Sequence, residues 1–177
     1  MSHNTISIND AKPSREGNIS SSLVFSEIRI GGDALSDNYS NSGATTLNGS
    51  TLYFYDPSPI NNIDGATITS SNDWISSVTL PAGTYILEAM FALSFSASGQ
   101  FSFQWFDGTT SRGTRAQIGS NLSHSTESAS SHSTLCITIT SSTTFSVKST
   151  SGSTNLNTVA NQGTNNSEQS FIRIRGF

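Results

Sequence analysis

The chain has 177 residues, of which 11% are charged and 33% are hydrophobic, and its formal net charge is −4 at pH 7. This length suits one β domain with a short extra segment rather than two domains. An acidic chain with eight Lys and Arg excludes a nucleic-acid backbone as a partner, and a single cysteine excludes an internal disulfide. No apolar run approaches the roughly 18 residues of a membrane span, so we expect no membrane insertion.

The N-terminal residues 1–22 predict an arm rather than part of a core. They are polar, are interrupted by a proline and a glycine, and hold one alternating apolar pair, Ile6 and Ile8. We expect this arm to dock on another protein by adding Ile6 and Ile8 as a strand to the partner's sheet edge. Lys12 and Arg15 would make contacts at the rim of that interface. The alternative is that the arm folds back on its own assembly.

Residues 23–177 predict one jelly-roll domain built from strands. Apolar and polar residues alternate with period two, and no window carries the i, i+3, i+4 stripe of a helix. In chain order we expect strands over residues 23–30, 51–55, 66–69, 74–80, 85–95, 101–105, 116–118, 135–140, 144–149 and 170–175. Short, closely spaced strands are typical of a sandwich or jelly roll, and an up-and-down barrel is the alternative.

The most apolar stretch, residues 80–108, predicts two consecutive strands with one-sided faces. The large or apolar positions of these faces are Tyr85, Leu87, Ala89, Phe91, Leu93, Phe95, Phe101, Phe103 and Trp105. Asp107 and Gly108 follow as a turn pair. We therefore expect a long antiparallel hairpin whose aromatic face covers a second sheet or another subunit.

Two long polar tracts, residues 119–134 and 150–169, contain too few apolar residues to form a core. Each lies between strong strands. We therefore expect loops at the ends of the sandwich, where binding surfaces are usually found.

The sequence predicts no catalytic residues, no metal ligands and no cofactor-binding residues. His124 and His132 flank Glu127, but their spacing converges on no strand or helix geometry, and we expect solvated polar residues there. The aspartates lie in loops or beside turns, which favours turn formation over an acid pair. Cys136 is expected to be a small packed residue without a basic neighbour to activate it.

Residues 80–93, "LPAGTYILEAMFAL", resemble the LPAGTY-x-I-x-A strand of phage tail-fibre and head-fibre proteins with a jelly roll of the tumour necrosis factor or complement-head type. The C-terminal "SFIRIRGF", residues 170–177, is similar to the last strand of that group. Upstream, residues 23–43 resemble a segment of virion and tail proteins, notably of phages infecting cyanobacteria. This chain departs from that segment at Ile30, where the group has an aromatic residue before the glycines.

The resemblance implies an all-β, homotrimeric jelly roll whose inner sheets meet at a threefold axis. In the last strand Ile172 and Ile174 share one face, so that face goes to the core and the other goes to neighbouring subunits. The residues expected at the trimer interface are Phe171, Arg173, Arg175 and Phe177. An ordinary solvated arginine face is the alternative.

For function, the resemblance implies a virion protein that is assembled in the host cytoplasm. Because the sequence offers no catalytic constellation, we expect that it is not an enzyme. We expect a small trimeric tail fibre or fibre tip that attaches to the particle and presents its loops to a host-surface glycan or protein. A capsid decoration or head-fibre protein that stabilises neighbouring coat subunits is one alternative. A glycan-active enzyme that uses loop carboxylates is the alternative from another class.

Overall fold

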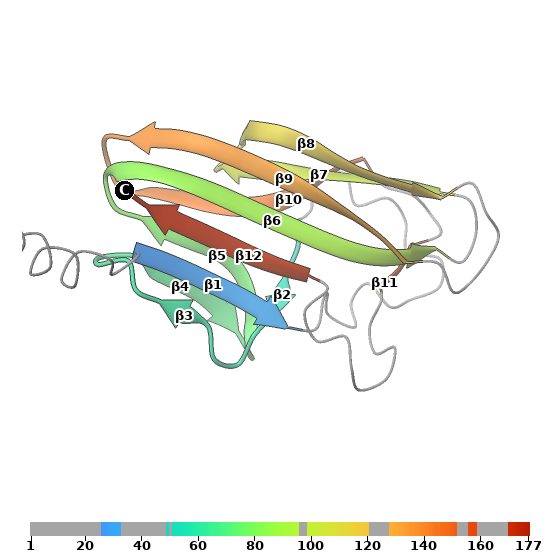
Figure 1. Cartoon of the computed structure of the whole chain (residues 1–177), viewed down its shortest axis with the longest axis horizontal. Helices are drawn as coiled ribbons and strands as arrows, with labels where there is room; N and C mark the ends of the chain where they lie inside the picture. Colours follow the sequence, from blue (N-terminus) through green and yellow to red (C-terminus); the bar gives the residue numbers. More distant parts are fainter. Residues whose placement is uncertain are drawn as a thin grey trace, which may run out of the picture.

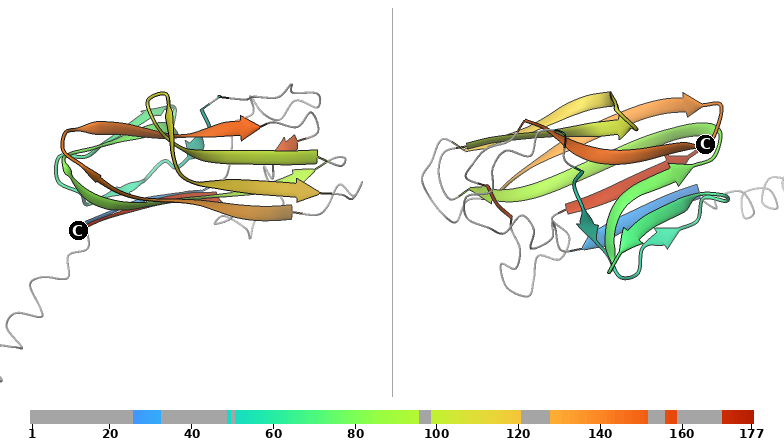
Figure 2. Two further views of the ribbon diagram at one scale, coloured as in Figure 1. Left: turned by 90° about the horizontal axis from the view of Figure 1, so that it is seen from above. Right: turned by 180° about the vertical axis from the view of Figure 1, so that it is seen from behind.

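In the part of the chain that the structure describes, twelve β-strands form two antiparallel sheets packed face to face (Figure 1). The computed structural model describes residues 26–32, 49, 51–95, 99–120, 128–151, 156–158 and 170–177. Within these ranges there is no helix, as the alternation predicted. The two layers are seen edge-on in the left view of Figure 2.

The first sheet has the strand order β9-β6-β12-β1-β3. Its strands are β1 (Ser26–Gly32), β3 (Ile60–Asn61), β6 (Gly83–Phe95), β9 (Ser128–Ile139), β11 (Leu156–Thr158) and β12 (Ser170–Gly176). β9 pairs with almost the whole length of β6, whereas β12 and β11 pair with successive parts of β6. The first and last strands, β1 and β12, therefore lie side by side within this sheet.

The second sheet has the strand order β4-β5-β10-β7-β8, and β2 pairs with the start of β5. Its strands are β2 (Phe54–Tyr55), β4 (Thr67–Ser71), β5 (Trp74–Leu80), β7 (Gly99–Asp107), β8 (Thr110–Ser120) and β10 (Thr143–Ser151). Asn72 and Asp73 form the two-residue turn between β4 and β5, with positive φ angles of 50° and 66°. Asn and Asp tolerate this conformation better than most residues, which explains a tight turn without glycine.

The core lies between the sheets and is formed by the faces that the alternation predicted. The predicted residues buried there are Tyr85, Leu87, Ala89, Phe91, Phe101, Phe103, Trp105, Ile172 and Ile174. The side chains of Leu93 and Phe95, also predicted there, lie outside the described part. Trp105 is fully buried, and its indole N–H donates to the Ser133 carbonyl of the other sheet at 3.3 Å.

The predicted hairpin within residues 80–108 is wrong, because β6 and β7 belong to different sheets. Their aromatic faces meet across the core, where the ring centroids of Phe91 and Phe103 are 4.8 Å apart at 70°. Each strand has one face that must leave water, and packing the two faces against each other buries both. The hairpin that forms is β7–β8, with Gly108 in its turn at a φ of 63°.

A bulge in β8 joins the two sheets along one edge of the sandwich. The register of β7 with β8 shifts between Phe103 and Trp105, and the extra residues lie in β8. Thr114, one of them, accepts the Thr134 amide at 2.8 Å through its hydroxyl. Its carbonyl accepts the Ser133 hydroxyl at 2.6 Å. These bonds tie β8 of the second sheet to β9 of the first.

The two predicted loops are wrong in part, because strands occupy some of residues 119–134 and 150–169. β8 extends to Ser120, β9 begins at Ser128, and residues 156–158 form β11. Composition favoured loops, but the serine-rich start of β9 pairs residue by residue with β6, so its backbone N–H and C=O groups have a neighbouring strand to bond. Tertiary pairing therefore overrides the polar composition here.

Candidate interaction surface

Four strands of the first sheet, β1, β12, β6 and β9, lie side by side (Figure 1). We call the side of these strands that points away from the core the outer face. Residues directly opposite each other in register point to the same side of a sheet, so the register arranges this face in rows. Read from β1 through β12 and β6 to β9, three rows are Gly31–Phe171–Met90–His132, Arg29–Arg173–Glu88–Thr134 and Glu27–Arg175–Ile86–Cys136.

The outer face carries three guanidinium groups and two carboxylates among its described residues. Arg173 Nε lies 3.2 Å from Glu27 Oε1, and an Arg175 terminal nitrogen lies 3.8 Å from Glu88 Oε2. The Nε–H of Arg173 is buried and not aligned for a hydrogen bond, so its contact is an ion pair only. Both pairs are partly exposed, and such pairs contribute about 1 kcal/mol or less.

Arg29 is the third guanidinium of the outer face, and it is exposed. It lies directly opposite Arg173 in the register of β1 and β12, and like charges in this position are unfavourable. Within the described ranges, no carboxylate forms an ion pair with Arg29. Among the described residues, Arg29 is therefore the guanidinium of this face that has no ion-pair partner.

Two phenylalanines mark the outward side of β12. The Phe171 ring is partly buried, with the Arg173 guanidinium 5.6 Å and the His132 ring 6.0 Å from its centroid. Phe177 follows β12 and is 79% exposed, although its amide donates to the Thr84 carbonyl at 3.1 Å. A phenylalanine exposed on an anchored backbone suits contact with a second surface.

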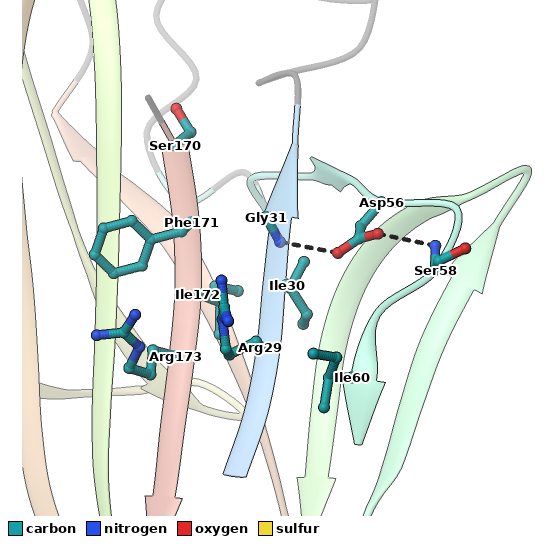
Figure 3. A pocket seen from close by; sticks show the side chains of 10 residues that line it. All are labelled: Arg29, Ile30, Gly31, Asp56, Ser58, Ile60, Ser170, Phe171, Ile172 and Arg173. Atoms are coloured by element: carbon teal, nitrogen blue, oxygen red, sulfur yellow. Dashed lines mark hydrogen bonds between the residues drawn. The ribbon is translucent and has the colours of Figure 1, made fainter. Parts of the chain in front are cut away.

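A groove of about 500 Å³ lies along the end of β1, beside the outer face (Figure 3). Its lining includes Arg29, Asp56, Ser58, Ile60, Phe171 and Arg173. Gly31 keeps this space open, because a Cβ at that position would meet no atom within 4 Å. The groove thus combines cationic, hydroxyl and apolar groups.

Asp56 fixes the connection that forms one wall of the groove. Its carboxylate accepts the amide of Gly31 at 2.9 Å and the amide of Ser58 at 2.8 Å, as the dashed lines in Figure 3 show. Both carboxylate oxygens are therefore bound to the protein's own backbone. Asp56 ties the segment between β2 and β3 to the edge of β1.

The structure brings together the four residues predicted at a subunit interface. Phe171, Arg173 and Arg175 lie on the outward side of β12, and Phe177 follows them in the same alternation. Sequence reasoning missed the contribution of β1, because only the register places Arg29 beside the last strand. The alternation in residues 26–30, "SEIRI", was the available signal, since it separates the core isoleucines from Glu27 and Arg29.

Other predicted positions are placed as follows. His132 and Cys136 both lie exposed on the outer face. The expectation that Cys136 is packed is therefore wrong, because it lies opposite Ile86 on the side of β9 that faces away from the core. His124 and Glu127 lie outside the described residues. In the described ranges no three His, Cys, Asp or Glu side chains are grouped to hold a metal ion, and no helix is long and apolar enough to span a bilayer.

The residues predicted for docking lie outside the part of the chain that the structure describes. They are Ile6, Ile8, Lys12 and Arg15 of the arm, residues 1–22. The docking arm therefore stays a prediction.

No protein-family model matches the sequence, and no curated protein matches it. Among solved structures, the Eiger TNF from S. frugiperda is similar, with 13% identity, a TM-score of 0.50, and coverage of 86% of this chain and 92% of that chain. The CBM6cm-2 carbohydrate-binding module from Cellvibrio mixtus lichenase 5A shares 17% identity over 84% of this chain and 96% of that one, with a TM-score of 0.31. The C-terminal CBM6 of LamC from Zobellia galactanivorans shares 16% identity over 84% of this chain and 98% of that one, with a TM-score of 0.30. At such identities likeness concerns the fold alone, and the chain has a TNF-like jelly-roll β-sandwich fold.

Proposed function

We propose that the chain is a phage virion protein, a small tail fibre or fibre tip that assembles as a homotrimer through the outer face. The observation that supports this proposal best is the outer face itself, where aromatic and guanidinium side chains stand in rows that no described segment covers. In this assembly, residues 1–22 dock on the particle, and the ends of the sandwich face a host-surface glycan or protein.

The energetics of the outer face suit burial between subunits. Covering a phenylalanine side chain is worth about 1.5–3 kcal/mol, and Phe177 has most of its surface still to bury. Arg173 and Arg175 already lie against carboxylates or an aromatic ring, which are the partners that arginine uses at interfaces. When a subunit contact removes water from these arginines, their charges therefore still have partners, which offsets the cost of desolvation.

Light scattering of the intact chain tests the trimer. We expect a mass three times the 18.7 kDa of one chain. Phe177→Ser should weaken assembly, whereas Lys148→Ser, which removes a side chain from the solvent side of the second sheet, should not. A monomeric mass for the natively folded chain contradicts the trimer.

Cell adsorption separates a tail fibre from a capsid decoration or head-fibre protein. A fibre tip should bind host cells and compete with phage adsorption, whereas a decoration protein should do neither. Incubation with surface polysaccharide tests the enzymatic alternative. Steady release of reducing ends that Asp107→Asn abolishes would overturn the non-enzymatic proposal; in the structure, Asp107 pairs with Arg112 at 2.7 Å.

Deleting residues 2–18 tests the docking arm. The truncated protein should keep its oligomeric mass and nearly its melting temperature, because the arm has too few apolar residues to contribute to a core. It should no longer be incorporated into particles. Normal incorporation of the truncated protein means that the arm does not dock.

A further inference from the structure

The starting observation is the guanidinium of Arg29 on β1, which has no ion-pair partner among the described residues. Arg173 and Arg175 have Glu27 and Glu88 as partners, so the guanidinium left over on the outer face is that of Arg29. It also lines the groove, together with Arg173. A carboxylate that pairs with Arg29 would therefore come from outside the described residues, and a bound ligand can supply one.

Asp56 does not play that role, although it lines the same groove. Both of its oxygens accept backbone amides, those of Gly31 and Ser58. Figure 3 shows the Asp56 carboxylate turned toward these two residues. The carboxylate keeps its negative charge, but its two oxygens are engaged by backbone amides, so Asp56 holds the wall of the groove in place and forms no ion pair with Arg29.

The remaining lining indicates what the anion is attached to. Ser58 offers a hydroxyl, while Ile60, which is 43% exposed, and the Phe171 ring offer apolar surface. Mixed hydroxyl and apolar walls suit a ring that has hydroxyl groups at its rim and C–H groups on its faces. At about 500 Å³, the groove is within the usual size range of small-molecule sites.

We propose that this groove binds the carboxylate of an acidic sugar, of the uronic acid class found in surface polysaccharides. Arg29 binds the carboxylate through charge-assisted hydrogen bonds. The sugar ring lies over Gly31, where the lack of a side chain leaves room, and contacts Ile60 and Ser58. This assignment rests on the proposed host-binding function and names the ligand class for it. It requires that the subunit contact of the outer face leaves the groove at the end of β1 open.

Calorimetry on the full-length protein tests the assignment, with digalacturonate and its neutral methyl ester as probes. The native protein should bind the acid in a saturable manner and the ester about tenfold or more weakly, because the ester cannot form the charge-assisted bonds. In Arg29→Gln the difference between acid and ester should vanish. Arg112→Gln, which removes a guanidinium of the second sheet, should leave both affinities unchanged.

Gly31→Val is a second variant that fills the groove without changing its charge. A Cβ at position 31 meets no atom within 4 Å, so the fold should survive and the acid should bind about tenfold or more weakly. Three results overturn the assignment: no saturable binding of the acid, equal binding of acid and ester, or an acid preference that persists in Arg29→Gln. A loss of trimer mass in Arg29→Gln also overturns it, because Arg29 is then a subunit contact.

The outcome separates this inference from the proposed function. If the native protein adsorbs to host cells but does not bind the uronate probe, the fibre function stands and the acidic-sugar site is wrong. If it binds the probe but neither adsorbs to cells nor competes with phage, the site stands and the host-binding function is wrong.

Discussion

Replacing Gly113 with alanine tests how the two sheets are joined. Gly113 lies in the bulge of β8 with a φ of 72°, and a Cβ there would contact the Thr134 carbonyl oxygen and lie 2.9 Å from the Leu135 Cβ. Gly108, in the β7–β8 turn, has a φ of 63°, but a Cβ there would meet no atom within 4 Å. The two glycines share a positive φ and differ in the space beside them.

The difference between the two alanine variants isolates the contact of β8 with β9. An L-residue in the left-handed region costs about 1–2 kcal/mol, so Gly108→Ala should lower the free energy of unfolding by that amount. Gly113→Ala bears the same cost and also pushes β8 away from β9, and overpacking of this kind costs about 1–3 kcal/mol more. We therefore expect a loss of about 2–5 kcal/mol for Gly113→Ala.

Urea denaturation followed by tryptophan fluorescence measures both variants. Trp105 is a reporter at the same junction, because its indole N–H donates to the Ser133 carbonyl of β9. Gly113→Ala should unfold at a markedly lower urea concentration than Gly108→Ala. Equal losses in the two variants would refute the close approach of β8 to β9.

Two further predictions concern single side chains. Asp56→Ala should lower the free energy of unfolding by about 1–2 kcal/mol, because two backbone amides lose a charged acceptor at a partly hydrated site. The control, Asp64→Ala at an exposed position, should change the free energy of unfolding by about 0.5 kcal/mol or less. Similar urea midpoints for these two variants contradict that role of Asp56. Burial raises the pKa of the Tyr85 hydroxyl, which donates to the Pro81 carbonyl at 3.0 Å. The native state thus favours the neutral phenol, so the contribution of Tyr85 to stability is complete below about pH 10 and is lost as pH rises above it. The stability difference between native protein and Tyr85→Phe should fall between pH 8 and 11, and a constant difference excludes this linkage.

Alternation of side chains predicted which face of each strand is buried, but not which strands pair. Phe91 and Phe103 were both assigned to buried faces, and both are fully buried. Whether their strands lie beside each other or opposite each other depends on contacts distant in the chain, and period two is the same in both cases. The hairpin prediction failed for that reason. Pairing with β6 likewise decided that residues 128–134 form a strand despite their polar composition.

Only the part of the candidate site that lies on the single strand β12 could be predicted from the sequence. Alternation and the resemblance of the C-terminal segment placed Phe171 and Arg173 on an outward side. The role of Arg29 depends on the pairing of β1 with β12, which joins the two ends of the described chain. Asp56 reaches the amide of Gly31 across 25 residues of sequence, and no local pattern shows such a bond. Sites assembled from strand register are therefore the part that single-sequence reasoning misses.

The charge of the outer face also bears on which symmetry buries it. Among the described residues this face has three guanidinium groups and two carboxylates, whereas the whole chain has a net charge of −4. In a twofold contact the face meets its own copy, which places in one interface two Arg29 groups that have no ion-pair partner among the described residues, and like charges repel. The excess of guanidinium groups on the outer face therefore argues against an isologous dimer formed through this face.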